Sequence, residues 1–175
     1  MRKLCFAFLM PSLAAVVSGC ASAPGLLEPA VPASLRVPPG ASVYLEVMAS
    51  GVQVYECARK ADGAFEWAFK YPDAALVDRA GKSVGKHYAG PTWEAADGSR
   101  VTGEVKAREA APSPSAIPWL LLAAKTNSGA GLLANAKFIQ RVNTVAGVAP
   151  TGGCAEPSLG KQARVAYTAD YFYYR

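Results

Sequence analysis

The chain has 175 residues, of which 51% are hydrophobic and 18% charged, and its formal net charge is +5. This length fits a single domain, and the apolar content excludes a disordered chain, which cannot bury enough surface to offset its ordering entropy. The basic residues form no cluster of the length that binds nucleic acid, so we expect no nucleic-acid partner. His87 is the only His in the chain, so catalytic mechanisms that require two His residues are excluded.

Residues 1–19 resemble a bacterial lipoprotein signal peptide. Arg2 and Lys3 precede an apolar run, Leu4 to Val17, that is too short for a membrane-spanning anchor. The run ends in Val17-Ser18-Gly19-Cys20. This tetrapeptide resembles the lipobox, in which the Cys is acylated and becomes the new N-terminus. We therefore predict a membrane attachment through lipidated Cys20; the alternative is an ordinary secreted protein cleaved near Ala23.

The residues after Cys20 bear on where the protein resides. Ala21 occupies the position where lipoproteins retained at the inner membrane commonly carry Asp, so the resemblance favours the outer membrane, with the domain facing the periplasm. Residues 20–34 are rich in Ala, Pro and Ser, which predicts a flexible tether behind the lipidated Cys. Residues 35–175 remain as one β-rich domain.

The four Cys reduce to one pair. Cys5 is removed with the signal peptide and Cys20 is lipidated, which leaves Cys57 and Cys154. Two Cys in an oxidising compartment usually form a disulfide. The alternatives are metal ligation or a reactive thiol, but one His and no Cys-x-x-Cys offer few partners for a metal. We predict a disulfide and no metal site.

From Leu35 onward, short runs with a period of two alternate with turn signals, which predicts strands. Val43–Val47 and Val52–Ala58 read as a hairpin, with Ala49-Ser50-Gly51 as a tight reversal. The same pattern predicts four further strands: Phe65–Tyr71, Arg100–Arg108, Phe138–Val145 and Arg164–Tyr174. Trp119–Ala124 suits a buried strand or a short helix.

These strands predict the fold class. Helical patterning is scarce, so we expect an all-β domain with at most one short helix. An antiparallel β-sandwich and a closed β-barrel-like domain both produce this pattern, and both stay open. Within Arg100–Arg108, we expect Val101 and Val105 to face the core, while Arg108 faces solvent.

Two short motifs match sequences found in catalytic or nucleotide-binding sites, but the residues around them do not fit such sites. Gly81–Gly85 matches G-x-S-x-G, but no helix pattern follows it, as a nucleophile elbow requires. Gly129–Ala134 matches G-x-G-x-x-A, but no Asp or Glu lies between Glu109 and Glu156 to hold a ribose. We read the first as a loop and the second as a flexible connection, and we expect no nucleotide or other cofactor.

The segment 85–98 (GKHYAGPTWEAADG) contains the densest group of chemically useful residues. If His87 approached Glu94 or Asp97, the carboxylate would raise the pKa of the imidazole and orient it as a general base. With Tyr88 and Trp93 as aromatic walls, His87 and Glu94 would instead bind a polar ligand. A purely structural role, with the aromatic residues in the core and His87 bonded to a loop carbonyl, is favoured over both.

The run FIQRVNTV places polar residues on both faces of a strand. Arg141 and Asn143 share one face, which we expect to be solvated, whereas Gln140 lies beside Phe138 and Val142. A buried Gln needs hydrogen-bond partners, so we predict that Gln140 holds a neighbouring loop in place.

Several blocks together resemble the family called domain of unknown function 3455, whose members are bacterial and fungal secreted or envelope proteins. The blocks are GVQVYEC, VGKHYAGPTWE, IPWLLLA, FIQRVNTVAGVAP and the aromatic C-terminal run, Tyr167–Tyr174. The resemblance implies an envelope location and offers no catalytic residues.

Three functions remain open from the sequence. The first is a lipid-anchored envelope protein whose β-domain binds a small ligand or an envelope component without catalysis. The second is a hydrolase-like envelope enzyme that uses His87 with Glu94 or Asp97. The third is a structural accessory that docks another envelope protein.

Overall fold

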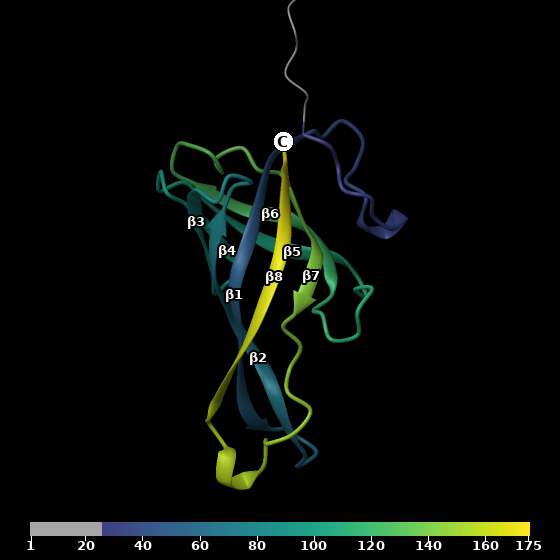
Figure 1. The fold of residues 1–175 in the computed structure, drawn as a ribbon, viewed down its shortest axis with the longest axis vertical. Helices are drawn as coiled ribbons and strands as arrows, with labels where there is room; N and C mark the ends of the chain where they lie inside the picture. The colour runs from purple at the N-terminus through teal and green to yellow at the C-terminus, as the bar shows by residue number, and fades with distance from the viewer. Residues whose placement is uncertain (1–25) are drawn as a thin grey trace, which may run out of the picture.

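The computed structural model describes residues 26–175, in which eight antiparallel strands form one closed sheet (Figure 1). Each strand pairs with the next along the chain, and the last pairs with the first. The strands are β1 (Val43–Arg59), β2 (Phe65–Val77), β3 (Ser83–Tyr88), β4 (Thr92–Ala95), β5 (Arg100–Glu109), β6 (Trp119–Ser128), β7 (Phe138–Ala146) and β8 (Gln162–Tyr174).

The predicted all-β class is confirmed, and the sheet is a closed barrel rather than two separate layers. The described residues contain no α-helix, only the 3-10 turns η1 (Ala33–Leu35) and η2 (Glu156–Ser158). Trp119–Ala124 belongs to a strand. No helix in this part of the chain is long and apolar enough to cross a membrane. The predicted signal peptide and the lipidation of Cys20 concern residues outside the described range.

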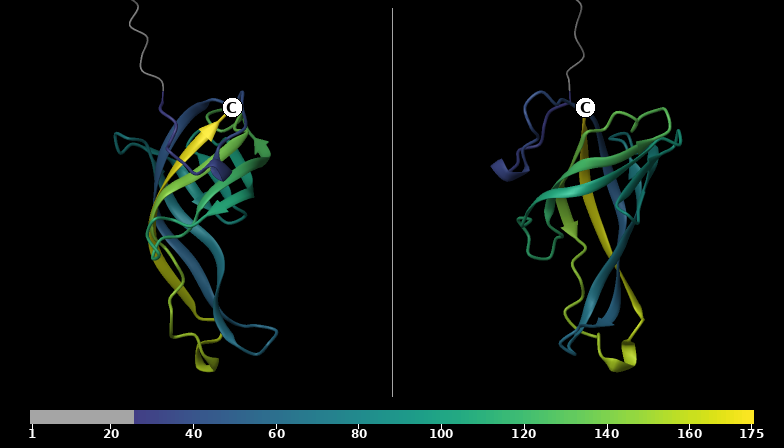
Figure 2. Two further views of the ribbon diagram at one scale, coloured as in Figure 1. Left: turned by 90° about the vertical axis from the view of Figure 1, so that its right-hand side faces the viewer. Right: turned by 180° about the vertical axis from the view of Figure 1, so that it is seen from behind.

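The barrel is uneven because its strands differ greatly in length. β1 has 17 residues and β2 and β8 have 13 each, whereas β3 has 6 and β4 has 4. The three long strands continue beyond the barrel body as a narrow extension, seen at the bottom of Figures 1 and 2. The body therefore has one end beside the chain termini and another end beside this extension.

The predicted reversal at Ala49-Ser50-Gly51 is wrong, since β1 runs through it without interruption. Gly51 pairs with Ala74 of β2 and with Tyr167 of β8. A Cβ atom on Gly51 would lie 2.2 Å from the Asp73 carbonyl oxygen and 2.4 Å from the Ala74 Cα. The glycine is therefore required by the close approach of β2, and not by a turn.

The interior of the barrel is a mainly aromatic and aliphatic core. Trp93, Tyr171 and Tyr173 are its largest fully buried side chains, and smaller residues such as Val47 and Leu122 fill the space between them. Burial of this apolar surface is the main favourable contribution to folding.

A second cluster lies on the outer surface of the sheet, under the segment 26–42. Val142, Phe172 and Tyr174 are buried there against Val31 and Val37. Gln140 Nε2 donates a hydrogen bond to the Leu35 carbonyl oxygen at 2.6 Å, and the Tyr174 hydroxyl donates to Gln140 Oε1 at 2.5 Å. The prediction that Gln140 holds a neighbouring segment is confirmed. Figure 2 (left) shows this segment against the barrel.

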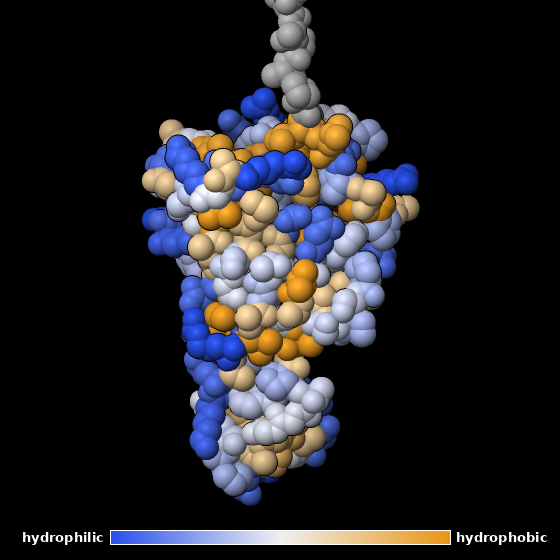
Figure 3. Space-filling view, viewed as in Figure 1, coloured by the Kyte–Doolittle hydropathy of each residue, from blue (hydrophilic) through white to orange (hydrophobic). Residues whose placement is uncertain are grey.

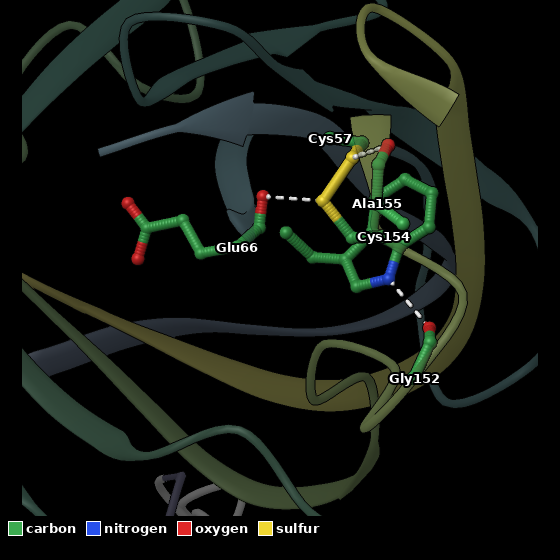
Figure 4. The surroundings of a disulfide bond; sticks show 6 residues. Cys57, Glu66, Gly152, Cys154 and Ala155 are labelled. Atoms are coloured by element: carbon green, nitrogen blue, oxygen red, sulfur yellow. Dashed lines mark hydrogen bonds between the residues drawn. A yellow bond between two sulfur atoms is a disulfide. The ribbon is translucent and has the colours of Figure 1, made fainter. Parts of the chain in front are cut away.

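The predicted disulfide between Cys57 and Cys154 is present and closes the tip of the extension (Figure 4). It joins the end of β1 to the loop between β7 and β8. Backbone bonds from Cys57 N to the Lys161 oxygen and from Gly160 N to the Cys57 oxygen add to this connection. The Trp67 indole also donates to the Gly152 carbonyl at 2.8 Å. The loop is thereby attached to β1 and β2.

Candidate functional site

The predicted segment 85–98 forms the hairpin of β3 and β4. His87 pairs with Trp93, and Lys86 pairs with Glu94. Because side chains alternate along a strand, the first pair faces the barrel interior and the second faces outward. His87 and Trp93 are 3% and 1% exposed. The structure therefore brings His87 and Trp93 together and places Tyr88 and Glu94 on the other face.

His87 is an uncharged residue of the barrel interior. Its ring stacks on Trp93, with centroids 4.3 Å apart and planes 7° apart, and meets the edge of Tyr171 at 5.3 Å. Nδ1 lies 2.9 Å from the Thr92 carbonyl oxygen, so Nδ1 carries the proton and donates. The pKa of His87 is lowered to about 3, mainly because the ring is buried. The hydrogen bond to Thr92 opposes this lowering, whereas the nearby positive charge of Arg141 adds to it. The neutral ring leaves Nε2 as a hydrogen-bond acceptor.

Glu94 belongs to a network on the outer surface. It accepts a hydrogen bond from the Tyr88 hydroxyl at 2.7 Å and forms ion pairs with Arg100 at 2.9 Å and Lys86 at 3.6 Å. The bond from Tyr88, together with the two cations, holds the pKa of Glu94 below its usual value against the opposing effect of desolvation.

Asp97 has a structural role in a turn. It accepts hydrogen bonds from Ser99 Oγ at 2.6 Å, from Ser99 N at 2.9 Å and from Leu132 N at 2.7 Å, and these bonds lower its pKa. The segment 129–134, which we read as a flexible connection, is thus attached to Asp97. Neither Asp97 nor Glu94 meets His87, so the acid–base pair that the sequence left open as an alternative is not formed.

A cavity of about 520 Å³ opens where the barrel body meets the extension. Its inner wall contains His87 and Trp93 of the predicted segment, while Tyr88, Glu94 and Asp97 do not line it. Apolar side chains form most of the remaining wall: Tyr55, Pro72, Ile117, Leu120 and Leu122. This volume and composition are typical of sites for small molecules, and an eight-stranded barrel has room for one such ligand.

Two exposed hydrophobic residues stand at the rim of the cavity. Phe69 of β2 is 53% exposed and Val105 of β5 is 42% exposed. The other large hydrophobic residues exposed in the described range are dispersed: Leu26, Leu27, Leu132, Val145 and Leu159. On the face seen in Figure 3, hydrophobic side chains occur in small groups among hydrophilic ones.

Polar groups without partners point to a ligand or ordered water in this region. Gln53 Nε2 and the Tyr171 hydroxyl are fully buried, belong to cavity-lining residues, and have no hydrogen-bond partner among the described residues. Such atoms are rare in native proteins, because an unpaired buried donor carries its whole desolvation cost. Trp93 Nε1 shares this condition, as do Trp119 Nε1 and the hydroxyls of Tyr167 and Tyr173, which do not line the cavity.

The cavity is also lined by two arginines that the sequence pattern did not indicate as site residues. Arg141 was expected to be solvated, but it lines the cavity, and its Nε and Nη2 donate to the Pro118 carbonyl at 3.1 and 2.7 Å. The reason is that the Gln140 and Val142 face of β7 lies outside the barrel, under the segment 26–42. Both faces of β7 are therefore covered, and alternation alone does not distinguish them.

Arg108 was also expected to face solvent with its neighbours on β5. Arg108 is exposed, as expected, but a register shift between Val105 and Ala107 interrupts the alternation and places Arg108 at the cavity as well. Bulges of this kind redirect side chains at the rims of barrels. No sequence signal marked the bulge.

The fold and cavity define the protein as a closed antiparallel β-barrel with a solvent-accessible internal site. Within residues 26–175, no three His, Cys, Asp or Glu side chains gather as a metal site would require. The chain belongs to the DUF3455 family, described as protein of unknown function, whose model matches residues 38–175. No curated protein and no solved structure matches the chain.

Proposed function

We propose that the protein is a lipid-anchored component of the bacterial envelope whose barrel binds a small ligand, without catalysis, on the periplasmic side. The observation that carries this proposal is the 520 Å³ cavity with two buried, unpartnered polar groups, Gln53 Nε2 and the Tyr171 hydroxyl, in its wall. A mainly apolar pocket with a few convergent polar groups is the usual form of a small-molecule site.

The lining of the cavity supports binding over catalysis. It contains no Ser, Thr or Cys nucleophile and no Asp or Glu among its described residues. His87 has no carboxylate to orient it or to stabilise its protonated form, and burial keeps it neutral. General base catalysis of the usual type needs a base with a pKa near the working pH.

A solvatochromic probe tests the binding site. The neutral dye N-phenyl-naphthylamine should fluoresce and saturate at one site in the purified domain. Val105→Trp places a large side chain at the rim and should weaken binding at least about tenfold, which corresponds to about 1.4 kcal/mol. Val145→Trp is the matched control, since Val145 is an exposed strand valine away from the cavity. Equal affinity in the two variants, or no saturable binding, would overturn the proposal.

The membrane attachment needs its own experiment. Cys20→Ser should move the protein from the membrane fraction to the soluble periplasmic fraction, and globomycin should cause accumulation of the unprocessed chain. Cys5→Ser, within the predicted signal peptide, is the control and should leave fractionation unchanged. Membrane fractionation that persists in Cys20→Ser would remove the lipid anchor from the proposal.

A further inference from the structure

We infer that the ligand is an organic anion, an apolar body carrying a carboxylate, whose charged group is held by Arg141 and Arg108. This inference rests on the proposed function and specifies its ligand class. It begins with the balance of charge in the cavity, which is lined by Lys70, Arg108 and Arg141 but by no acidic side chain.

The two arginines of the cavity, like Arg36 and Arg175, form no ion pair within the described range, whereas the other arginines there do. Four other arginines pair with a carboxylate at 2.7 to 2.9 Å: Arg59, Arg79, Arg100 and Arg164. Within the described range, neither Arg108 nor Arg141 has an acidic group within ion-pair distance. Lys70 is already neutralised by Glu56 at 3.4 Å. The cavity thus has two unmatched positive charges.

Arg141 is fixed in position and partly buried. Nε and Nη2 both donate to the Pro118 carbonyl, which holds the guanidinium against the cavity wall close to the Tyr171 hydroxyl. Burial is the main cause of the lowered pKa of His87 and of the raised pKa of Tyr171. The charge of Arg141 reaches both groups, adding to the shift of His87 and opposing that of Tyr171. A partly desolvated cation is costly without a counterion, and a guanidinium matches the geometry of a carboxylate.

The other unpartnered groups at the inner end are suited to the same ligand. Gln53 Nε2 and the Tyr171 hydroxyl are hydrogen-bond donors, and carboxylate oxygens accept such bonds. Leu120, Leu122 and Trp93 supply an apolar wall beside these donors. A lining that combines cations and hydrogen-bond donors with hydrocarbon fits an amphipathic acid better than a neutral apolar molecule or a cation.

Paired probes test this inference. Dansylaminoundecanoic acid and its methyl ester share an apolar body and differ by one negative charge. The acid should bind the wild-type domain at least about tenfold more tightly than the ester, and added NaCl should weaken only the acid. Arg141→Gln should remove most of the preference for the acid by weakening the binding of the acid, and Arg141→Lys should retain part of this preference.

Two further variants keep the result interpretable. Arg108 lies on the exposed rim, so Arg108→Gln should leave the fold intact and lower the affinity for the acid. It therefore tests the inference even if Arg141→Gln does not fold. Arg100→Gln, on the same strand but outside the cavity, should change neither affinity. Equal binding of acid and ester, or a preference that survives in both Arg141→Gln and Arg108→Gln, overturns the inference but leaves a binding cavity. Failure of both probes to bind overturns the proposed function as well.

Discussion

Removal of the disulfide is expected to destabilise the domain strongly without changing its cavity. Cys57 and Cys154 are 97 residues apart in the chain, and their bond closes the tip of the extension. The perturbation is the double variant Cys57→Ala, Cys154→Ala, which avoids free thiols. The nearest cavity-lining residue on β1 is Tyr55, whose hydroxyl donates to the Gly147 carbonyl at 2.6 Å independently of the disulfide.

The expected loss follows from the loop that the disulfide closes. In the chain-entropy model, a cross-link over 97 residues lowers the entropy of the unfolded chain enough to stabilise the fold by about 4.7 kcal/mol. Domains of ordinary size have a free energy of unfolding of roughly 5–15 kcal/mol, so this is a large share. The corresponding fall in melting temperature is about 10 to 20 °C.

Urea denaturation followed by tryptophan fluorescence, together with differential scanning calorimetry, measures this loss. Glu156→Gln is the control, because it removes the ion pair with Arg59 at the same tip, and that exposed pair contributes less than about 1 kcal/mol. A double variant that loses less than about 1 kcal/mol would refute the reasoning, because the entropy of the unfolded chain would then not be the source of the stability.

Three further predictions concern single residues. Since burial gives His87 a folded-state pKa of about 3, against about 6.5 when unfolded, the free energy of unfolding should fall as pH drops from about 6.5 toward 3, by up to about 1.4 kcal/mol per unit. Urea titrations across this range should show a shallower decline in His87→Gln, and identical slopes would contradict the assignment. Gln140→Ala should cost about 1–3 kcal/mol and speed tryptic cleavage after Arg36, because the bond to the segment 26–42 is lost; unchanged cleavage would show that packing alone holds the segment. Gly51→Ala should cost about 3 kcal/mol or more in thermal denaturation, since its Cβ meets backbone atoms, whereas Gly152→Ala meets nothing and should be neutral. Similar melting temperatures for these two variants would argue against the close strand crossing.

The strand content and the disulfide were predictable from local information. Alternation marks β5, β7 and β8, and the elimination of two Cys leaves one pair. The continuity of β1 was not predictable in this way. A glycine in an Ala-Ser-Gly sequence is typical of a turn, and only the position of β2, supplied by residues 73 and 74, shows that Gly51 permits a close crossing instead.

The candidate site was found only in part. His87 and Trp93 do line a cavity, as the concentration of unusual residues around them suggested. Glu94 does not line the cavity, because the hairpin register puts it on the other face of the sheet from His87. Arg141 was missed because its outward neighbours are covered by a segment from far along the chain. Both errors concern which face of a strand is inside, and tertiary packing decides that question.

The position of the segment 26–42 bears on how a ligand reaches the barrel. This segment lies beside the C-terminal end of β8, at the same end as Val43 (Figure 1). Gln53 lies ten residues further along β1, about 33 Å away at the usual rise of a strand. The cavity wall at Gln53 is therefore separated from the segment 26–42 by much of the length of β1. None of the residues 26–42 lines the cavity, so a ligand would reach it without displacing this segment.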